Sequence, residues 1–353
     1  MGMSKSQRLI TIFTPSHADA GGTNAQQLTV KEIVSRLPAE RFHVTMFSGE
    51  QPDPRIAARP NTLLIPARSH GNTRRFLARL LVARPDIYFY PRFGPLDNLF
   101  FSLRRRLRMR TAVVTHVVMI MNDATAEING RSIREADAVF ANSRYVAETV
   151  RSTFGIESGT IHNGIDRRVF FSREEESRPG PLVVLYAGSF QARKRVELII
   201  RQAARHPDIH FRLAGRGETE APCRALAQQV GSHNIEFVGH LTPAELGDEM
   251  RRSDVFLFPS MLEGHPQVLG QASACGLPSI AMNLYRPDYL LNGESGFLVE
   301  SDAELAEKLD LLLRDANLRR SMSRAAALHS LKFDWDHIAL QWQEVFEAVT
   351  AKR

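Results

Sequence analysis

Cysteine is nearly absent from this chain of 353 residues, which contains only Cys223 and Cys275. Two thiols are too few for the disulfide frameworks of small secreted domains, so a reducing compartment is expected. No apolar run approaches the roughly 20 residues that a membrane-spanning helix needs. The apolar run near the N-terminus, residues 9–13, has strand character and does not follow the layout of a signal peptide. These absences favour a cytoplasmic protein.

Several motifs that indicate other functions are also missing. The chain has no G-x-G-x-x-G fingerprint, which argues against a nicotinamide cofactor. Its 12 histidines are scattered, and no Asp-x-Asp stands in an expected strand-end loop, so no metal site and no cofactor are predicted. No recognised binding module or aromatic stacking pattern accompanies the basic residues, so nucleic acid is not expected as a partner.

The net charge of +6 is unevenly distributed. Residues 68–110 contain 11 arginines, and most of them fall in two runs, one from Arg74 to Arg84 and one from Leu99 to Arg110. Both runs mix apolar and basic residues at near-helical spacing, as interfacial helices do. They predict peripheral contact with the inner face of an anionic membrane, or with a phosphorylated acceptor. The alternative is a pair of helices packed on a sheet with solvated arginines.

Short apolar runs alternate with helical patterns along both halves of the chain, which indicates a parallel sheet in each half. The runs cover residues 9–13, 44–47, 62–65, 87–90, 112–119 and 138–141, and then residues 182–188, 209–215, 235–239, 255–259 and 277–282. Residues 172–181 are charged and aperiodic, as in a linker. The sequence therefore predicts an α/β protein with two Rossmann-like domains, residues 1–171 and 182–333. A ligand would bind at the carboxyl ends of their strands, in the cleft between them.

The most informative segment is residues 259–281, PSMLEGHPQVLGQASACGLPSIA. A buried strand precedes it, Glu263 begins the turn, and Pro266 stands where the first residue of a helix tolerates proline. Gly276 is placed to end that helix. The unpaired N–H groups of a first helical turn attract phosphate, while Glu263 can accept hydrogen bonds from sugar hydroxyls and Gln271 can reach a ribose. This spacing suits a nucleotide sugar.

The segment resembles the Glu-x7-Glu signature of retaining GT-B glycosyltransferases, family 4, and the resemblance extends over nearly the whole chain. It implies two facing Rossmann-like domains and a C-terminal helix, residues 334–353, that crosses back to the first domain. In that family the first Glu, here Glu263, holds the hydroxyls of the donor sugar. The second Glu holds the ribose, and its position is occupied by Gln271, which offers one acceptor and one donor group instead of a carboxylate.

The resemblance also implies backbone contacts to the sugar and the diphosphate just after Glu263. These would come from Gly264, His265, Gln267 and Val268, because a proline at position 266 supplies no N–H. Metal is not needed in the resembled family, since protein cations and helix ends neutralise the diphosphate.

A second element, AGSFQARKRVELI, resembles the family's Gly-Arg-Leu-x3-Lys-Gly element, whose Arg and Lys neutralise the diphosphate. Gly188 and Lys194 match, whereas Ser189 replaces the Arg and Arg195 replaces the final Gly. We expect Arg193 to compensate, because a guanidinium can bind two phosphate oxygens at once. The alternative is an ordinary basic helix start exposed to water.

Three further matches are weaker. Gly21 and Gly22 resemble the Gly-rich loop that approaches the donor phosphates, although a plain turn explains a Gly pair equally well. His116 lies in a strongly apolar strand where the family often has a His near the transferred sugar, and the alternative is a core histidine. Gly215 and Leu241 match positions that border the base pocket.

Taken together, these residues predict a cytoplasmic glycosyltransferase that moves a sugar from a nucleotide diphosphate donor to a saccharide, lipid-linked glycan or small-molecule acceptor. Resemblance implies retention of configuration without a metal. One alternative is a weak or inactive GT-B subunit that scaffolds an active partner, which the departures at Ser189 and Gln271 favour. Another is a sugar-nucleotide epimerase of the same fold.

Overall fold

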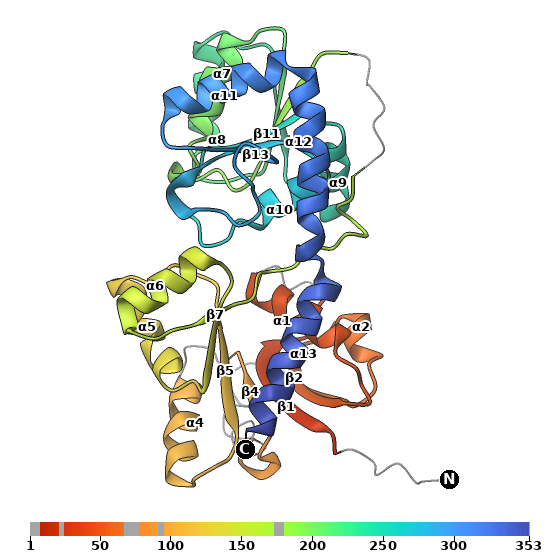
Figure 1. Cartoon of the computed structure of the whole chain (residues 1–353), viewed down its shortest axis with the longest axis vertical. Helices are drawn as coiled ribbons and strands as arrows, with labels where there is room; N and C mark the ends of the chain where they lie inside the picture. Colours follow the sequence, from red (N-terminus) through yellow and green to blue (C-terminus); the bar gives the residue numbers. More distant parts are fainter. Residues whose placement is uncertain are drawn as a thin grey trace. The chain divides into compact units, whose positions relative to one another are not determined.

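The computed structural model describes residues 8–20, 25–66, 78, 80–90, 95–172 and 180–352. The chain divides into two compact units, one formed by Met1–Gly164 with Trp335–Arg353 and the other by Ile165–Asp334. In each unit the named strands form one parallel sheet, and helices accompany it (Figure 1). The predicted α/β class is confirmed.

The first unit has seven strands in the order β3-β2-β1-β4-β5-β6-β7. The strands are β1 (Ile10–His17), β2 (Phe42–Ser48), β3 (Thr62–Pro66), β4 (Ile87–Phe89), β5 (Ala112–Val117), β6 (Ala138–Ala141) and β7 (Gly159–Thr160). The helices are α1 (Ala25–Arg36), α2 (Pro54–Ala57), α4 (Pro95–Arg106), α5 (Asp123–Arg134), α6 (Arg144–Phe154) and α13 (Trp335–Ala351). The six apolar runs predicted in this half all lie on strands, and only the two-residue β7 was missed.

The helix α13 belongs to the first unit although it ends the chain. Trp342 and Phe346 on α13 are fully buried, and their rings pack against Phe89 of β4 at centroid distances of 5.0 Å. Burial of each such side chain contributes about 2 kcal/mol. Figure 1 shows α13, in dark blue, beside α1 of the same unit. The prediction of a C-terminal helix that joins the first domain is confirmed.

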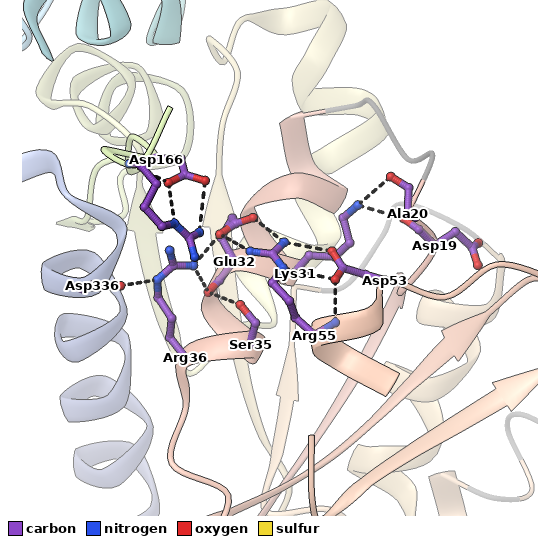
Figure 2. Close-up of polar contacts among 11 residues, drawn as sticks. Asp19, Ala20, Lys31, Glu32, Ser35, Arg36, Asp53, Arg55, Asp166 and Asp336 are labelled. Carbon is purple, nitrogen blue, oxygen red and sulfur yellow. Dashed lines mark hydrogen bonds and ion pairs between the residues drawn. The ribbon is translucent and has the colours of Figure 1, made fainter. Parts of the chain in front are cut away.

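A network of charged side chains joins α1 to α2 and α13 (Figure 2). Glu32 on α1 is 4% exposed and accepts from Arg55 of α2 at 2.7 Å and from Arg36. Arg36 also donates to Asp336 of α13 at 2.6 Å. Because Glu32 has two cationic partners, its burial does not leave a charge unpaired. The network fixes the three helices relative to one another within the first unit.

The second unit has six strands in the order β10-β9-β8-β11-β12-β13. The strands are β8 (Val183–Ala187), β9 (His210–Ala214), β10 (Ile235–Gly239), β11 (Val255–Phe258), β12 (Ser279–Met282) and β13 (Gly296–Val299). The α-helices are α7 (Val196–Arg205), α8 (Glu220–Gln229), α9 (Pro243–Arg251), α10 (Gln267–Ala274), α11 (Asp302–Arg314) and α12 (Ala316–His329). Short 3-10 helices are η1 (Ala192–Lys194), η2 (Asn283–Tyr285) and η3 (Ser330–Phe333).

The apolar runs of the second half form the middle of this sheet. All four residues of β11 and all four of β12 are buried, as expected for parallel strands covered on both faces. The five runs predicted in this half all lie on strands, whereas β13 was missed because its four residues follow a turn and carry no long apolar run. Gly276 has φ +68°, which ends α10 in the left-handed conformation that glycine favours.

Candidate functional site

The strand order of the second sheet brings two loops together. β8 is the first strand of the unit in the chain, and it pairs with β9 on one side and with β11 on the other. The order of strands reverses here, and in open α/β sheets ligands bind beyond the carboxyl ends of the strands at such a reversal. Arg193 and Lys194 follow β8, and Glu263 follows β11.

Three donors converge on one carboxylate oxygen of Glu263. The Nη1 atom of Arg193 lies 2.6 Å from Oε1, the Oγ atom of Ser260 lies 2.5 Å from it, and Lys194 Nζ donates to the same atom. Among the described residues, none donates a hydrogen bond to the second oxygen, Oε2. Glu263 therefore has one oxygen that holds two cations in place and one that can accept hydrogen bonds from a ligand.

Lys194 is enclosed by protein. Its residue is 8% exposed, and Nζ lies 4.8 Å from the centre of the Phe258 ring. Burial lowers the pKa of Lys194, and the negative charge of Glu263 opposes this shift. The alternative of a basic helix start in water does not describe Lys194, which sits in η1 ahead of α7. The side chain of Arg193 is 39% exposed, so Arg193 is the more accessible of the two cations.

Gly188, Ser189 and Gly215 make backbone contacts next to this cluster. The carbonyl of Ser189 accepts from the Tyr186 hydroxyl at 2.9 Å. A side chain on Gly215 would place Cβ 1.9 Å from the carbonyl oxygen of Gly188, so the close approach of these two loops requires glycine there. Leu241, which follows β10, is half-buried. No cation stands at position 189, where the family element has Arg.

The helix α10 begins one residue later than the sequence indicated. Pro266 is its N-cap, and Gln267 is the first helical residue. Gly264, Gln267 and Val268 are half-buried and lie at the start of the helix, directly after Glu263. A proline at the cap removes no helical hydrogen bond, because the first N–H groups of a helix have no partner within it.

Gln271 and His265 lie in different environments. Gln271 is half-buried on α10, and its side chain makes no hydrogen bond with any described residue. The ring of His265 stacks on Tyr289 at a centroid distance of 4.0 Å and is 7% exposed. Any contribution of His265 to ligand binding would therefore come from its backbone, as the resemblance implies.

His116 is a core residue of the first unit, and the cluster around Glu263 belongs to the second. Its Nε2 atom lies 3.0 Å from the carbonyl oxygen of Ile161, and its ring packs against Trp342 at 5.0 Å. Because a carbonyl only accepts, Nε2 carries the proton. Burial lowers the pKa of His116 to about 4, so the ring is neutral at pH 7. A role for His116 beside the transferred sugar stays a prediction.

Gly21 and Gly22 lie outside the described residues. The chain just ahead of them is held by Lys31 of α1, whose Nζ donates to the carbonyl of Asp19 at 2.8 Å and to that of Ala20 at 3.4 Å (Figure 2). Lys31 is 3% exposed. It fixes the end of the segment that leads into the predicted Gly-rich loop.

The two basic runs differ in what the structure describes. Residues 74–77 and 79 of the run from Arg74 to Arg84 lie outside the described residues, and the run from Leu99 to Arg110 covers most of α4 and the turn after it. Arg104 does not face water, because it donates to the carbonyl of Thr111 at 2.8 Å and pairs with Asp137. Arg104 therefore fits the alternative of a helix packed on the sheet, and membrane contact by the rest of this run stays a prediction.

The described residues contain neither a metal-binding cluster nor a helix that could span a membrane. No group of three or more His, Cys, Asp or Glu side chains in the described part of the chain could hold a metal ion. Within the same residues, no helix combines the length and the apolar character needed to cross a membrane.

Two family models match the chain. The model for glycosyl transferases group 1 matches residues 168–329, and the model for glycosyltransferase family 4 matches residues 26–169. The first match contains the whole cluster around Glu263, and the two together run without a gap from residue 26 to residue 329. The two matches make the chain similar to the group 1 glycosyltransferases, and its two parallel sheets have the GT-B fold.

Named relatives agree with this family. An uncharacterized glycosyltransferase of Methanocaldococcus jannaschii is 23% identical over 218 residues, which are 61% of this chain and 60% of that protein. The glycogen synthase of Mycobacterium tuberculosis is 29% identical over 236 residues, 63% of this chain and 56% of that protein. The chain therefore matches less than two thirds of the length of each of these two relatives.

A solved structure shows the same fold. The Anabaena protein HepE, crystallised with UDP and glucose, superposes with a TM-score of 0.75 over 96% of this chain and 100% of that one, at 16% identity. The predicted fold, with two Rossmann-like domains, is confirmed.

Ser260 is a member of the cluster that sequence reasoning missed. It is fully buried, and its hydroxyl donates to Oε1 of Glu263, the oxygen that also accepts from Arg193 and Lys194. The available signal was its position, two residues after the end of β11 and three before Glu263. A serine that lies just after a strand and a few residues before a candidate site carboxylate can orient that carboxylate through its hydroxyl.

Proposed function

We propose that this protein transfers a sugar from a nucleoside diphosphate donor to a hydroxyl of a glycan or lipid-linked acceptor, with retention of configuration and without a metal. The observation that carries the proposal is the convergence of Arg193, Lys194 and Ser260 on Glu263 at the strand reversal of the second sheet. The matches to the two glycosyltransferase models, and the nucleotide and sugar bound to the Anabaena protein, support it. The comparisons do not favour the scaffolding alternative.

Glu263 would orient the donor sugar through Oε2, the oxygen to which no described residue donates a hydrogen bond. Its other oxygen would hold Arg193 and Lys194 toward the diphosphate. With Glu263 the two cations leave a net charge of +1, which favours departure of a leaving group that gains negative charge as the bond breaks. The first N–H groups of α10 would add a positive end of a helix dipole.

The remaining donor contacts would follow the family pattern. Gln271 would bind the ribose through its amide, and Gly188, Gly215 and Leu241 would border the base. Ser189 carries no charge that could stabilise the leaving phosphate, so more of this stabilisation would come from Arg193.

Retention would follow from attack on the face that the leaving group departs from. The bond between the anomeric carbon and the donor oxygen breaks, the acceptor oxygen bonds to the same carbon, and the acceptor proton passes to the leaving phosphate. No protein general base is required, and Lys194 would stabilise the departing diphosphate instead of removing the proton.

Peripheral membrane contact would bring a lipid-linked acceptor to the first unit. Arg106 and Arg108 are exposed near the end of α4, and Leu99 and Leu107 are 46% and 51% exposed. Exposed apolar side chains next to arginines suit an anionic lipid surface. Arg104 and Arg105 instead pair with Asp137 and Glu135.

Replacement of Glu263 tests the proposal. After a thermal-shift screen of UDP-, GDP- and ADP-sugars has identified the donor, we expect Glu263→Ala to lower turnover at least tenfold, or about 1.4 kcal/mol. Binding of the free nucleoside diphosphate should stay equal or become tighter by calorimetry, because the variant removes a negative charge from the site.

Glu307→Ala is the matched control, since Glu307 is 69% exposed on α11. Unchanged turnover in Glu263→Ala, or a wild-type protein that binds none of the nucleoside diphosphates at millimolar concentration, would contradict the proposed function.

A further inference from the structure

The first sheet also reverses its strand order, and it does so at β1. β1 is the first strand of its unit, and it pairs with β2 on one side and with β4 on the other. In open α/β sheets a ligand binds beyond the carboxyl ends of the strands at such a reversal. Since the proposed donor site lies at the reversal of the second sheet, the reversal at β1 is suited to the other substrate, the acceptor.

A histidine and an aspartate lie at the carboxyl end of β1. His17 is the last residue of the strand, and Asp19 follows it after one residue. The Nδ1 atom of His17 lies 3.4 Å from Oδ2 of Asp19, and the two side chains are 32% and 29% exposed. The pair is therefore partly enclosed by protein and still within reach of a ligand from solvent.

Asp19 is held by contacts from two other elements. Its Oδ1 atom accepts from the backbone N–H of Gly49 at 2.5 Å, and its carbonyl accepts from Nζ of Lys31 at 2.8 Å (Figure 2). A Cβ on residue 49 would lie 3.1 Å from both carboxylate oxygens, so glycine allows the chain after β2 to approach this closely. Because Oδ1 is bound to Gly49, Oδ2 is the oxygen that faces His17.

The carboxylate determines which nitrogen of His17 carries the proton. A negative oxygen beside Nδ1 favours the tautomer that has its hydrogen there, which leaves Nε2 as a hydrogen-bond acceptor. The imidazole packs beside the ring of Phe47 on β2, with the centroids 5.7 Å apart. Apart from Asp19 and Phe47, no described residue makes a polar or ring contact with the side chain of His17. Nε2 is thus an acceptor without a partner in the described part of the chain.

The charge around His17 favours a neutral ligand. The accessible charge beside the ring is the carboxylate of Asp19, because the neighbouring Lys31 is only 3% exposed. A carboxylate repels a phosphate group, whereas a sugar hydroxyl is uncharged and can donate to Nε2. The pair therefore suits a saccharide and not a phosphorylated group.

We infer that His17 binds a hydroxyl of a saccharide acceptor through Nε2, and that Asp19 positions the ring for this contact. The inference rests on the proposed function and assigns acceptor residues to it. The hydroxyl that His17 binds is not the one that reacts, so the proton of the reacting hydroxyl still passes to the leaving phosphate. Asp19 acts through His17 and does not touch the acceptor.

Kinetics with octyl glycosides of glucose, galactose, mannose and N-acetylglucosamine test the inference. Release of nucleoside diphosphate from the donor is measured with and without each glycoside. With the glycoside that raises release most, we expect His17→Phe to raise the acceptor KM about fivefold, the effect of one lost hydrogen bond. The donor KM and the hydrolysis of the donor without acceptor should change less than about twofold, because the proposed donor contacts lie in the second unit.

Two further variants separate binding from structure. His17→Gln keeps a carbonyl oxygen near the position of Nε2, so it should recover most of the acceptor affinity that His17→Phe loses. Asp19→Asn should also raise the acceptor KM, because an amide NH2 beside Nδ1 favours the tautomer with its hydrogen on Nε2. The control is His337→Phe, at an exposed position of α13 in the same unit, which should keep the wild-type acceptor KM.

The outcomes are distinct. A wild type that binds no nucleoside diphosphate, or releases none from any donor, overturns the proposed function itself. A wild type that hydrolyses the donor but transfers to none of the glycosides contradicts the inferred saccharide site. The role of His17 is also wrong if His17→Phe keeps the acceptor KM, or if His17→Gln is as impaired as His17→Phe. Equal loss of transfer and of donor hydrolysis, with a lower melting temperature, would show that the pair is only structural.

Discussion

At the level of single residues, the cluster depends on the different roles of the two carboxylate oxygens of Glu263. Oε1 accepts from Ser260 and from two cations that lie about seventy positions earlier in the chain. Without the serine and the cations a half-buried carboxylate would be costly, and without the carboxylate two neighbouring cations would repel each other. The sequence indicated all three charged residues, because Glu263 and Lys194 each match a motif of the resembled family and Arg193 stands next to Lys194.

Gln271 provides a test of the predicted ribose contact. We expect Gln271→Glu to increase the preference for a ribonucleoside diphosphate over its 2′-deoxy analogue about threefold, since a carboxylate accepts from two hydroxyls and an amide from one. The ratio of the two dissociation constants is the measurement, because an added negative charge weakens both ligands alike. An unchanged ratio would place Gln271 away from the ribose, and Gln228→Glu on α8 serves as the control.

At the level of secondary-structure elements, two described turns of the second unit hold an arginine in the left-handed conformation that glycine favours. Arg195 has φ +55° between η1 and α7, and Arg286 has φ +41° after η2. The side chain of Arg195 pairs with Asp302 of α11, which compensates for the strained turn. The family element has glycine at the position of Arg195. The sequence therefore indicated a departure from the family, but it did not show that the backbone there is left-handed.

The turn after α4 provides a test of membrane contact. We expect the protein to sediment with vesicles that contain anionic phosphatidylglycerol, and to be released as salt rises from 50 to 500 mM, because screening shortens the reach of surface charges. The double variant Arg106→Gln with Arg108→Gln should lose at least half of this binding.

The matched control is Arg201→Gln with Arg252→Gln, two exposed arginines of the second unit. Binding that persists in 500 mM salt, or that falls equally in both double variants, would show that α4 is an ordinary surface helix.

At the level of the whole molecule, stability at acid pH depends on groups buried within the units. His116 is an example, because burial lowers its pKa to about 4 from an ordinary value of 6.5. The folded state therefore resists protonation more than the unfolded state does. Its contribution is complete above pH 6.5 and is lost as the pH falls from 6.5 to 4, and the shift corresponds to about 3 kcal/mol.

The prediction is that the free energy of unfolding, measured with urea from pH 7 to pH 4, falls less steeply in His116→Phe than in the wild type. The variant should also be less stable at pH 7, since the carbonyl of Ile161 loses a donor. His337→Phe, at an exposed position on α13, should keep the wild-type slope. Equal slopes in all three proteins would remove His116 as a source of acid sensitivity.

The sequence by itself indicated the α/β class, eleven of the thirteen described strands, and the residues Glu263, Arg193 and Lys194 that the structure brings together. Buried parallel strands appear as continuous apolar runs, and the motifs lie at their carboxyl ends, so local pattern was sufficient. The apolar pattern did not predict β7 and β13, because their two and four residues do not form a distinct apolar run.

Only the tertiary structure decided which atoms meet. Ser260 lacks a motif, and its place beside Arg193 and Lys194 follows from the pairing of β8 with β11. The same holds for His116, whose apolar strand was evident although its partners Ile161 and Trp342 lie far away in the chain. Local sequence fixes the type of element, whereas contacts between distant residues arise only when the sheet is assembled.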